Sequence, residues 1–128
     1  MTLAVDASAL LAILLDEPDA EFYLSKILVA TAALISPANW WEVQVHMQSL
    51  YGEAGEKKSA EWMKRLSIVV EPVTLEHAQI ALGAFRRFRG RPARLKMGDC
   101  FAYALAQSRN IPLLYKGGDF SATDVMTG

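Results

Sequence analysis

The sequence predicts an α/β sandwich, in which a parallel sheet lies between layers of helices. Short apolar runs alternate with longer segments of helical composition along the chain. Strands that are separated by helices are expected to pair in parallel. The apolar runs lack polar alternation, which is typical of strands whose sheet is covered on both faces. The 128 residues are enough for one domain and too few for two, so we expect a single domain over 1–128.

The first half of the chain predicts two strands and three helices. The run "LAVD" is a short buried strand that ends in an acid, and Ser8 stands near the start of the helix after it. Pro18 is expected in the first turn of the second helix, where proline is tolerated. Ser36 and Pro37 open the third helix, and Gly52 stops it. We expect strands at 3–6 and 33–36, and helices at 7–15, 17–32 and 37–52.

The second half predicts three further helices and two strands. Thr74 is a suitable N-cap for the second of these helices, and Asn110 ends the third. The last segment, "GGDFSATDV", indicates a loop that holds at most one helical turn. We expect helices at 56–66, 74–88 and 98–110, and strands at 67–73 and 111–116.

Composition limits the classes of protein that fit this chain. Hydrophobic residues make up 52% and charged residues 21%, which is typical of a globular domain. Cys100 is the only cysteine, so no internal disulfide can form, and this favours the reducing cytoplasm. The apolar run near the N-terminus is interrupted by Asp6 and has no basic flank, so it does not fit a signal peptide. No segment approaches the roughly 20 apolar residues of a membrane span, so we expect no membrane association.

Charge is distributed unevenly along the chain. The net charge is −1, but the segment 86–96 holds six basic residues and no acid, which leaves −7 on the remainder. A basic segment on an acidic body suggests two surfaces with different functions, although cations are also favoured at helix C-termini. Gly90 and Pro92 indicate a loop that is free to reach outward. The basic residues are Arg86, Arg87, Arg89, Arg91, Arg94 and Lys96.

Five acids stand at strand ends, at helix starts or among apolar neighbours. Asp6 ends the first strand, Glu42 lies within the helix after the second, and Asp99 begins a late helix. Asp119 and Asp124 follow the last strand. Ligands of parallel sheets bind at the carboxyl ends of the strands, and clustered buried carboxylates need a cation or a proton. Oxygen ligands favour Mg²⁺ or Mn²⁺, so the pattern predicts a divalent metal site.

Each of these residues also has a structural interpretation. Asp6 and Asp99 could each cap a helix N-terminus, and Ser8 could be an ordinary helix-start hydroxyl. Asp119 and Asp124 could be turn residues. Neither histidine of the chain is spaced as part of a zinc motif. The aromatic side chains that could stack on nucleic-acid bases, or equally belong to the core, are Trp40, Trp41 and Tyr103.

Four segments, in order along the chain, resemble the PIN-domain ribonucleases, and specifically the VapC-type toxins of bacterial type II toxin–antitoxin systems. The segments are "VDASALLAILLDEPDA", "SPANWWEV" around Glu42, "GDCFAYALA" and "PLLYKGGDFSATDV". The resemblance covers essentially the whole chain. It implies a PIN-like three-layer α/β/α sandwich with a short parallel sheet of four or five strands.

The resemblance also implies a function and a set of site residues. The expected activity is that of a Mg²⁺-dependent endoribonuclease toxin, with Mn²⁺ as the alternative ion. The toxin is expected to form a homodimer and to be neutralised by a cognate antitoxin. The segment 86–96 is expected to bind RNA or the antitoxin. Gly118 stands where many members carry an acid, so the fourth acid is Asp119 or, as second choice, Asp124, or the site is built from three acids. The implied catalytic acids are Asp6, Glu42, Asp99 and Asp119, with Asp6 and Asp99 as metal ligands and Ser8 and Asp124 in support.

Two other functions fit the same residues. A catalytically silent PIN-fold module that binds RNA or protein is favoured by the glycine at position 118. A DNA-directed nuclease would use the same acidic site. The apolar helices within 7–31 are expected to form either core or a dimer surface.

Overall fold

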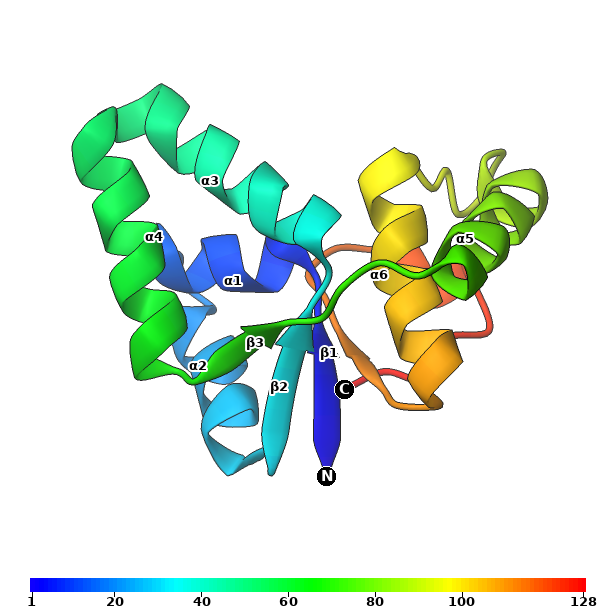
Figure 1. Ribbon diagram of the computed structural model, residues 1–128, viewed down its shortest axis with the longest axis horizontal. Coiled ribbons are helices and arrows are strands. Elements are labelled where there is room, and N and C mark those ends of the chain that lie inside the picture. Colours follow the sequence, from blue (N-terminus) through cyan, green and yellow to red (C-terminus); the bar gives the residue numbers. More distant parts are fainter.

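A four-stranded parallel sheet lies at the centre of the computed structural model, which describes residues 1–128 (Figure 1). The strand order is β3-β2-β1-β4, so β1 has a neighbour on each side. Ala4 of β1 lies opposite Leu34 on one side and opposite Leu113 on the other. The predicted α/β class and parallel pairing are therefore confirmed. The strands are β1 (Thr2–Val5), β2 (Ala32–Ile35), β3 (Ile68–Val70) and β4 (Leu113–Leu114).

Six α-helices connect these strands, one short 3₁₀-helix follows the last strand, and each predicted helix is present. The second helix begins at Ala20, so Pro18 lies in the turn before it and not within its first turn. The Ala20 amide donates to the Glu17 carbonyl and closes this turn. The last strand is shorter than the apolar run that predicted it. The helices are α1 (Ala7–Leu14), α2 (Ala20–Val29), α3 (Pro37–Tyr51), α4 (Glu53–Arg65), α5 (Leu75–Phe88), α6 (Met97–Arg109) and the 3₁₀-helix η1 (Phe120–Ala122).

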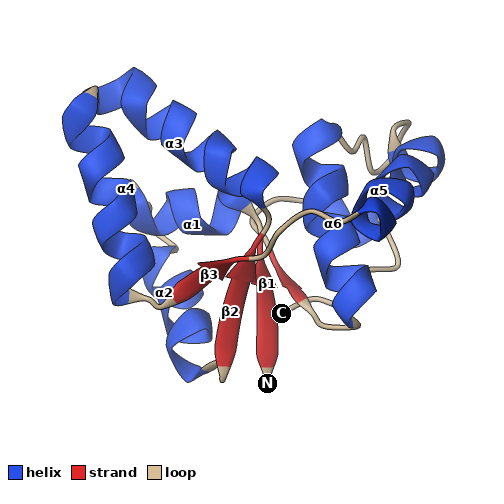
Figure 2. Ribbon diagram, in the orientation of Figure 1, coloured by secondary structure: helices blue, strands red, loops and turns tan.

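The two faces of the sheet are covered by different helices, which makes three layers (Figure 2). Alternate residues of β1 point to opposite faces: Leu3 and Val5 pack with α1 to α4, whereas Ala4 packs with α5 and α6. Most of α1 is buried in the first core. Within 7–31, most apolar side chains of α1 therefore belong to the core, whereas Phe22, Leu28 and Val29 of α2 are exposed. None of the helices combines the length and apolar composition that crossing a bilayer requires.

The chain order places a reversal point beside β1. The sheet grows from β1 to β2 to β3 on one side, and β4 then returns to the other side of β1. Ligands of open parallel sheets bind outside the carboxyl ends of the strands at such a reversal. Asp6 is the residue that directly follows β1, so the first candidate acid lies at this position.

The antiparallel pair of α3 and α4 depends on a close approach that only glycine permits. A Cβ on Gly55 would overlap the backbone carbonyl of Met47, whereas a Cβ on Gly83 of α5 would meet nothing within 4 Å.

We expect Gly55→Ala to lower the free energy of unfolding by about 1–3 kcal/mol, because α3 and α4 must separate. The matched substitution Gly83→Ala should raise it by roughly 0.5–1 kcal/mol, because alanine favours helix and the site has room. Urea unfolding of both variants measures the two effects. Equal stability of the two variants would contradict this account of the α3–α4 contact.

Candidate active site

Asp6 combines a helix-capping role with a place in the acidic site. Its Oδ2 atom accepts hydrogen bonds from the Ser8 amide at 3.0 Å and from Ser8 Oγ at 2.6 Å. The side chain is buried, with 5% of its surface exposed. Burial raises the pKa of Asp6 to about 7 against the opposing effect of the Ser8 hydrogen bonds, and the charges of Asp99 and Glu42 add to the increase. The capping interpretation of Asp6 is thus confirmed, and it leaves Oδ1 free of protein hydrogen bonds.

Ser8 connects Asp6 to the end of β4. The Lys116 amide donates to Ser8 Oγ at 2.9 Å, so one hydroxyl holds both the carboxylate and the chain that leaves the last strand. The Lys116 ammonium is held elsewhere, by Glu17 at 3.1 Å and Asp19 at 3.0 Å in the turn between α1 and α2. These two acids raise the pKa of Lys116. The nearest strand-end cation is therefore committed to other carboxylates and does not neutralise Asp6.

Glu42 is held by two residues that sequence reasoning missed. Asn39 Nδ2 donates to Glu42 Oε1 at 2.8 Å and to the Gly98 carbonyl at 3.0 Å. A Cβ on Gly98 would overlap the Glu42 carboxylate, so a larger residue where α6 begins would displace that carboxylate. Burial raises the pKa of Glu42, the Asn39 hydrogen bond opposes this, and Asp99 adds to it. In the sequence, this contact between α3 and α6 is indicated only by an asparagine one turn before Glu42 and a glycine directly before Asp99.

Asp99 lies in the first turn of α6 but is not its N-cap. The helix begins at Met97 with Lys96 at the N-cap position, and Asp99 Oδ2 accepts the Lys96 amide at 2.9 Å. The capping interpretation is therefore corrected to a first-turn acid that reaches back to the N-cap amide. Burial raises the pKa of Asp99, the hydrogen bond from Lys96 opposes this, and the charge of Asp119 adds to it.

The structure brings four of the predicted acids together at the carboxyl ends of β1, β2 and β4. Asp6 is affected by the charges of Glu42 and Asp99, and Asp99 by that of Asp119. Asp119 itself is exposed, directly before η1. The charges of these carboxylates repel one another, and no basic side chain forms an ion pair with any of them.

The donor set fits a hard, hydrated divalent ion. Its donors are carboxylate oxygens, and the hydrogen bonds of Asp6, Asp99 and Glu42 each involve one oxygen and leave the other free. No group of three acidic, histidine or cysteine side chains is close enough to hold an ion directly as the side chains stand. Mg²⁺ typically keeps several waters and binds through one or two carboxylates, so two of these acids are sufficient.

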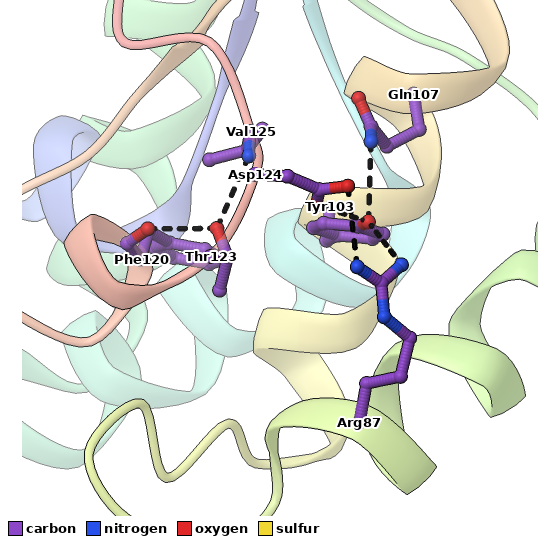
Figure 3. Close-up of polar contacts among 7 residues, drawn as sticks. All are labelled: Arg87, Tyr103, Gln107, Phe120, Thr123, Asp124 and Val125. Carbon is purple, nitrogen blue, oxygen red and sulfur yellow. Dashed lines mark hydrogen bonds and ion pairs between the residues drawn. The ribbon is translucent and has the colours of Figure 1, made fainter.

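Asp124, the second choice for the fourth acid, belongs to a hydrogen-bonded network with Tyr103 and Arg87 (Figure 3). Its carboxylate accepts the Tyr103 hydroxyl at 2.6 Å and pairs with Arg87 at 3.3 Å. The Tyr103 hydrogen bond, followed by Arg87, lowers the pKa of Asp124, whereas the pKa values of Asp6, Glu42 and Asp99 are raised. Gln107 also donates to the Tyr103 hydroxyl, at 3.1 Å. The network ties the C-terminal segment to α5 and α6.

The basic segment is anchored and is not a free loop. Ala93 and Leu95 are buried, and the Leu95 amide donates to the Phe88 carbonyl at 2.8 Å. Arg87 belongs to the Asp124 network, and the Arg89 guanidinium lies 5.4 Å from the centre of the Phe85 ring. Arg86 is exposed on α5. The exposed basic residues between α5 and α6 that keep free charges are Arg91, Arg94 and Lys96.

The other singled-out side chains divide between core and surface. Burial, followed by the charge of Asp99, raises the pKa of Cys100 to about 11, so it is a small core residue and no nucleophile. Tyr103 is buried and Trp40 packs against the first core, whereas Trp41 is 62% exposed next to Glu42. His77 is buried, with its Nε2 2.9 Å from Ser108 Oγ.

Removal of the charge on Asp6 should stabilise the metal-free protein at high pH. The pKa of Asp6 rises from 3.8 to about 7 on folding, so the folded chain binds an extra proton between these values and stability falls as pH rises through them. Asp6→Asn keeps the acceptor for Ser8. We expect it to raise the free energy of unfolding by about 2–4 kcal/mol near pH 8 and to have little effect near pH 4.

Urea unfolding in EDTA at the two pH values measures this difference. Addition of Mg²⁺ should stabilise the wild type near pH 8 and reduce its deficit. Equal stability of wild type and Asp6→Asn near pH 8 would show that the folded structure tolerates the Asp6 charge without cost.

Comparisons with known proteins agree on one family. The family model for the PIN domain matches residues 3–126. A protein named Ribonuclease VapC from Mycolicibacterium smegmatis is 40% identical over 125 residues, which cover 96% of this chain and 97% of that protein.

Solved structures share the fold at lower identity. A toxin–antitoxin complex from Klebsiella pneumoniae matches with a TM-score of 0.78 and 16% identity, over 98% of this chain and 96% of that one. VapC20 of Mycobacterium tuberculosis, described as a toxin that cleaves the sarcin–ricin loop, matches with a TM-score of 0.76 and 21% identity, over 98% of both chains.

Proposed function

Because the chain belongs to the PIN-domain family and is a VapC-type ribonuclease toxin, we propose that its acid cluster cleaves RNA with the help of Mg²⁺. The observation that carries this proposal is the convergence of Asp6, Glu42, Asp99 and Asp119 at the reversal point of the sheet. The raised pKa values of the first three acids indicate a site that favours binding of positive charge.

Asp6 and Asp99 would hold the ion, as resemblance to the family implies. A divalent ion, Mg²⁺ or Mn²⁺, supplies an activated water and cancels charge on the leaving oxygen when it is bound. Ser8 fixes the Asp6 carboxylate through two hydrogen bonds, and the Lys96 amide fixes that of Asp99. These contacts keep one oxygen of each acid turned to the protein and free the other.

Glu42 and Asp119 have separate roles in this proposal. Glu42 is half-buried and its pKa is raised, which suits a group that accepts a proton from the attacking water. Asp119 is exposed and lies close enough to raise the pKa of Asp99. It would complete the cluster at its solvent side.

The substrate is proposed to be RNA, and the exposed basic residues Arg91, Arg94 and Lys96 offset its repulsion from the acids. Arg91 and Arg94 lie just before α6, whose first turn carries Asp99. Phosphate contacts from lysine and arginine supply affinity for any sequence. DNA cleavage is the competing activity, which a matched DNA substrate tests.

The partners are proposed to be a cognate antitoxin and a second copy of the chain, in the cytoplasm. The fold is shared with the toxin–antitoxin complex of K. pneumoniae. For the homodimer, exposed apolar side chains on α3 and α5 are better candidates than α1, which is buried. They are Trp41, Val45, Leu82 and Phe85.

A catalytically silent RNA- or protein-binding module is the second candidate function. Gly118 at a position where many family members carry an acid favours it, as does the lack of three acidic side chains that could hold one ion together.

Asp99→Asn separates the two candidates. We expect it to reduce cleavage of labelled RNA by more than ~100-fold. Substitution of residues that only support a metal ligand already reduces activity about 10–100-fold, and loss of a ligand itself should cost more. Its metal-free stability should be unchanged or raised, since one repelling charge is lost while the Lys96 amide keeps an acceptor. The matched control Asp16→Asn changes an exposed acid outside the cluster and should cleave as the wild type does. Wild-type cleavage that persists in EDTA, or is absent with Mg²⁺, would overturn the proposal.

Neutralising Arg91 and Arg94 together tests the role of the basic segment. If they bind RNA phosphates, binding of all RNA sequences should weaken, and the slope of log affinity against log salt should flatten by roughly 0.7 per lost contact. Turnover at saturating RNA should change little, because the acids stay in place. If the arginines instead bind the antitoxin, the salt slope stays the same and the double variant escapes inhibition. No change in either assay would leave the segment without a binding role.

A further inference from the structure

Asn39 is a fully buried polar side chain in the first turn of α3. It has 0% of its surface exposed. Its Nδ2 group donates both of its hydrogen bonds, but its Oδ1 atom is buried without a partner. An unpaired buried carbonyl costs free energy, which a leucine of similar shape would avoid. The amide is therefore explained by what its Nδ2 group holds.

The two acceptors of Asn39 belong to different parts of the site. One is Oε1 of Glu42, one turn further along α3, at 2.8 Å. The other is the carbonyl of Gly98 in the first turn of α6, directly before Asp99, at 3.0 Å. Both partners are oxygen acceptors, so only the NH₂ group of the amide can face them. This chemistry fixes the orientation of the side chain.

Gly98 closes the arrangement from the other side. A Cβ there would overlap the Glu42 carboxylate in its present position and force it to move. Glu42 is therefore confined between the Asn39 amide and the Gly98 backbone. Because α3 packs in one core and α6 in the other, the Asn39 side chain bonds across the seam between the two halves of the molecule.

We infer that Asn39 is a positioning residue, which sets the Glu42 carboxylate and the Asp99-bearing turn of α6 in one fixed arrangement for cleavage. Asn39 occupies Oε1 of Glu42 and so leaves Oε2 for the attacking water. The inference rests on the proposed function, because it assigns Glu42 to the cleavage step. Asn39 itself touches neither water nor substrate and acts through Glu42 and Gly98.

Asn39→Leu tests this role, since it removes the donors and roughly keeps the volume. We expect kcat to fall about 10–100-fold with KM for RNA nearly unchanged, as for residues that orient the groups that react. In a Glu42→Gln background the same change should cause little further loss, because there is no carboxylate left to position. Gly98→Ala should reproduce the kcat loss, whereas Gly83→Ala should not.

A purely structural role for Asn39 predicts a different pattern. Ser59→Ala is the control, because Ser59 is also fully buried and its hydroxyl bonds only the Gly55 carbonyl, within α4. Ser59→Ala should lower stability and leave kcat of the folded enzyme intact. The inference fails if Asn39→Leu behaves like Ser59→Ala, or if its kcat loss is the same with and without the Glu42 carboxylate.

A second measurement does not depend on cleavage. In the metal-free protein, the side-chain NH₂ signals of Asn39 should exchange slowly with solvent and shift in Glu42→Gln, as followed by ¹⁵N NMR. Fast exchange, or signals unaffected by Glu42→Gln, would overturn the inference. If the wild type cleaves no RNA, the proposed function is wrong, and the NMR result still decides whether Asn39 holds Glu42.

Discussion

Asp6, Glu42 and Asp99 lie at one edge of the sheet and repel one another, and the hydrogen bonds of the neighbouring residues hold them in place despite this repulsion. Asp6, Glu42 and Asp99 each receive hydrogen bonds on one oxygen, and every donor is neutral: a serine, an asparagine amide and a backbone amide. Neutral donors orient a carboxylate without cancelling its charge. The site thus keeps its negative charge and fixes its geometry at the same time.

The cations of the region are arranged to the same effect. Lys116, at the end of β4, pairs with Glu17 and Asp19, and Arg87 pairs with Asp124. The first of these pairs holds the Lys116 ammonium on Glu17 and Asp19, although the Lys116 amide bonds Ser8 beside Asp6. Had Lys116 reached Asp6, it would have lowered the pKa of that group and reduced the benefit of binding a metal. Glu17 and Asp19 therefore contribute to the site by holding Lys116 away, whereas the charge of Lys96 still lowers the pKa of Asp99.

Sequence patterns predicted what is local in this structure and missed what is not. Apolar runs and capping residues such as Thr74 identify strands and helices, because they act within a few residues. The acids were predicted from their places at strand ends and from family resemblance. The contact of Asn39 with Gly98 joins residues 59 positions apart, and no pattern in the intervening chain encodes it. The anchoring of the basic segment by Ala93 and Leu95 was also missed, because small and apolar residues between arginines read as loop.

The strand order also decides when the enzyme is complete during its own synthesis. Asp6 and β1 are synthesised early, and β1 can pair with β2 soon afterwards. The other neighbour of β1, which is β4, and Asp119 are synthesised much later. Contacts that close such long loops form late, because the entropy of closure must be overcome first. A nascent chain therefore carries the first acid through most of translation without its full set of partners.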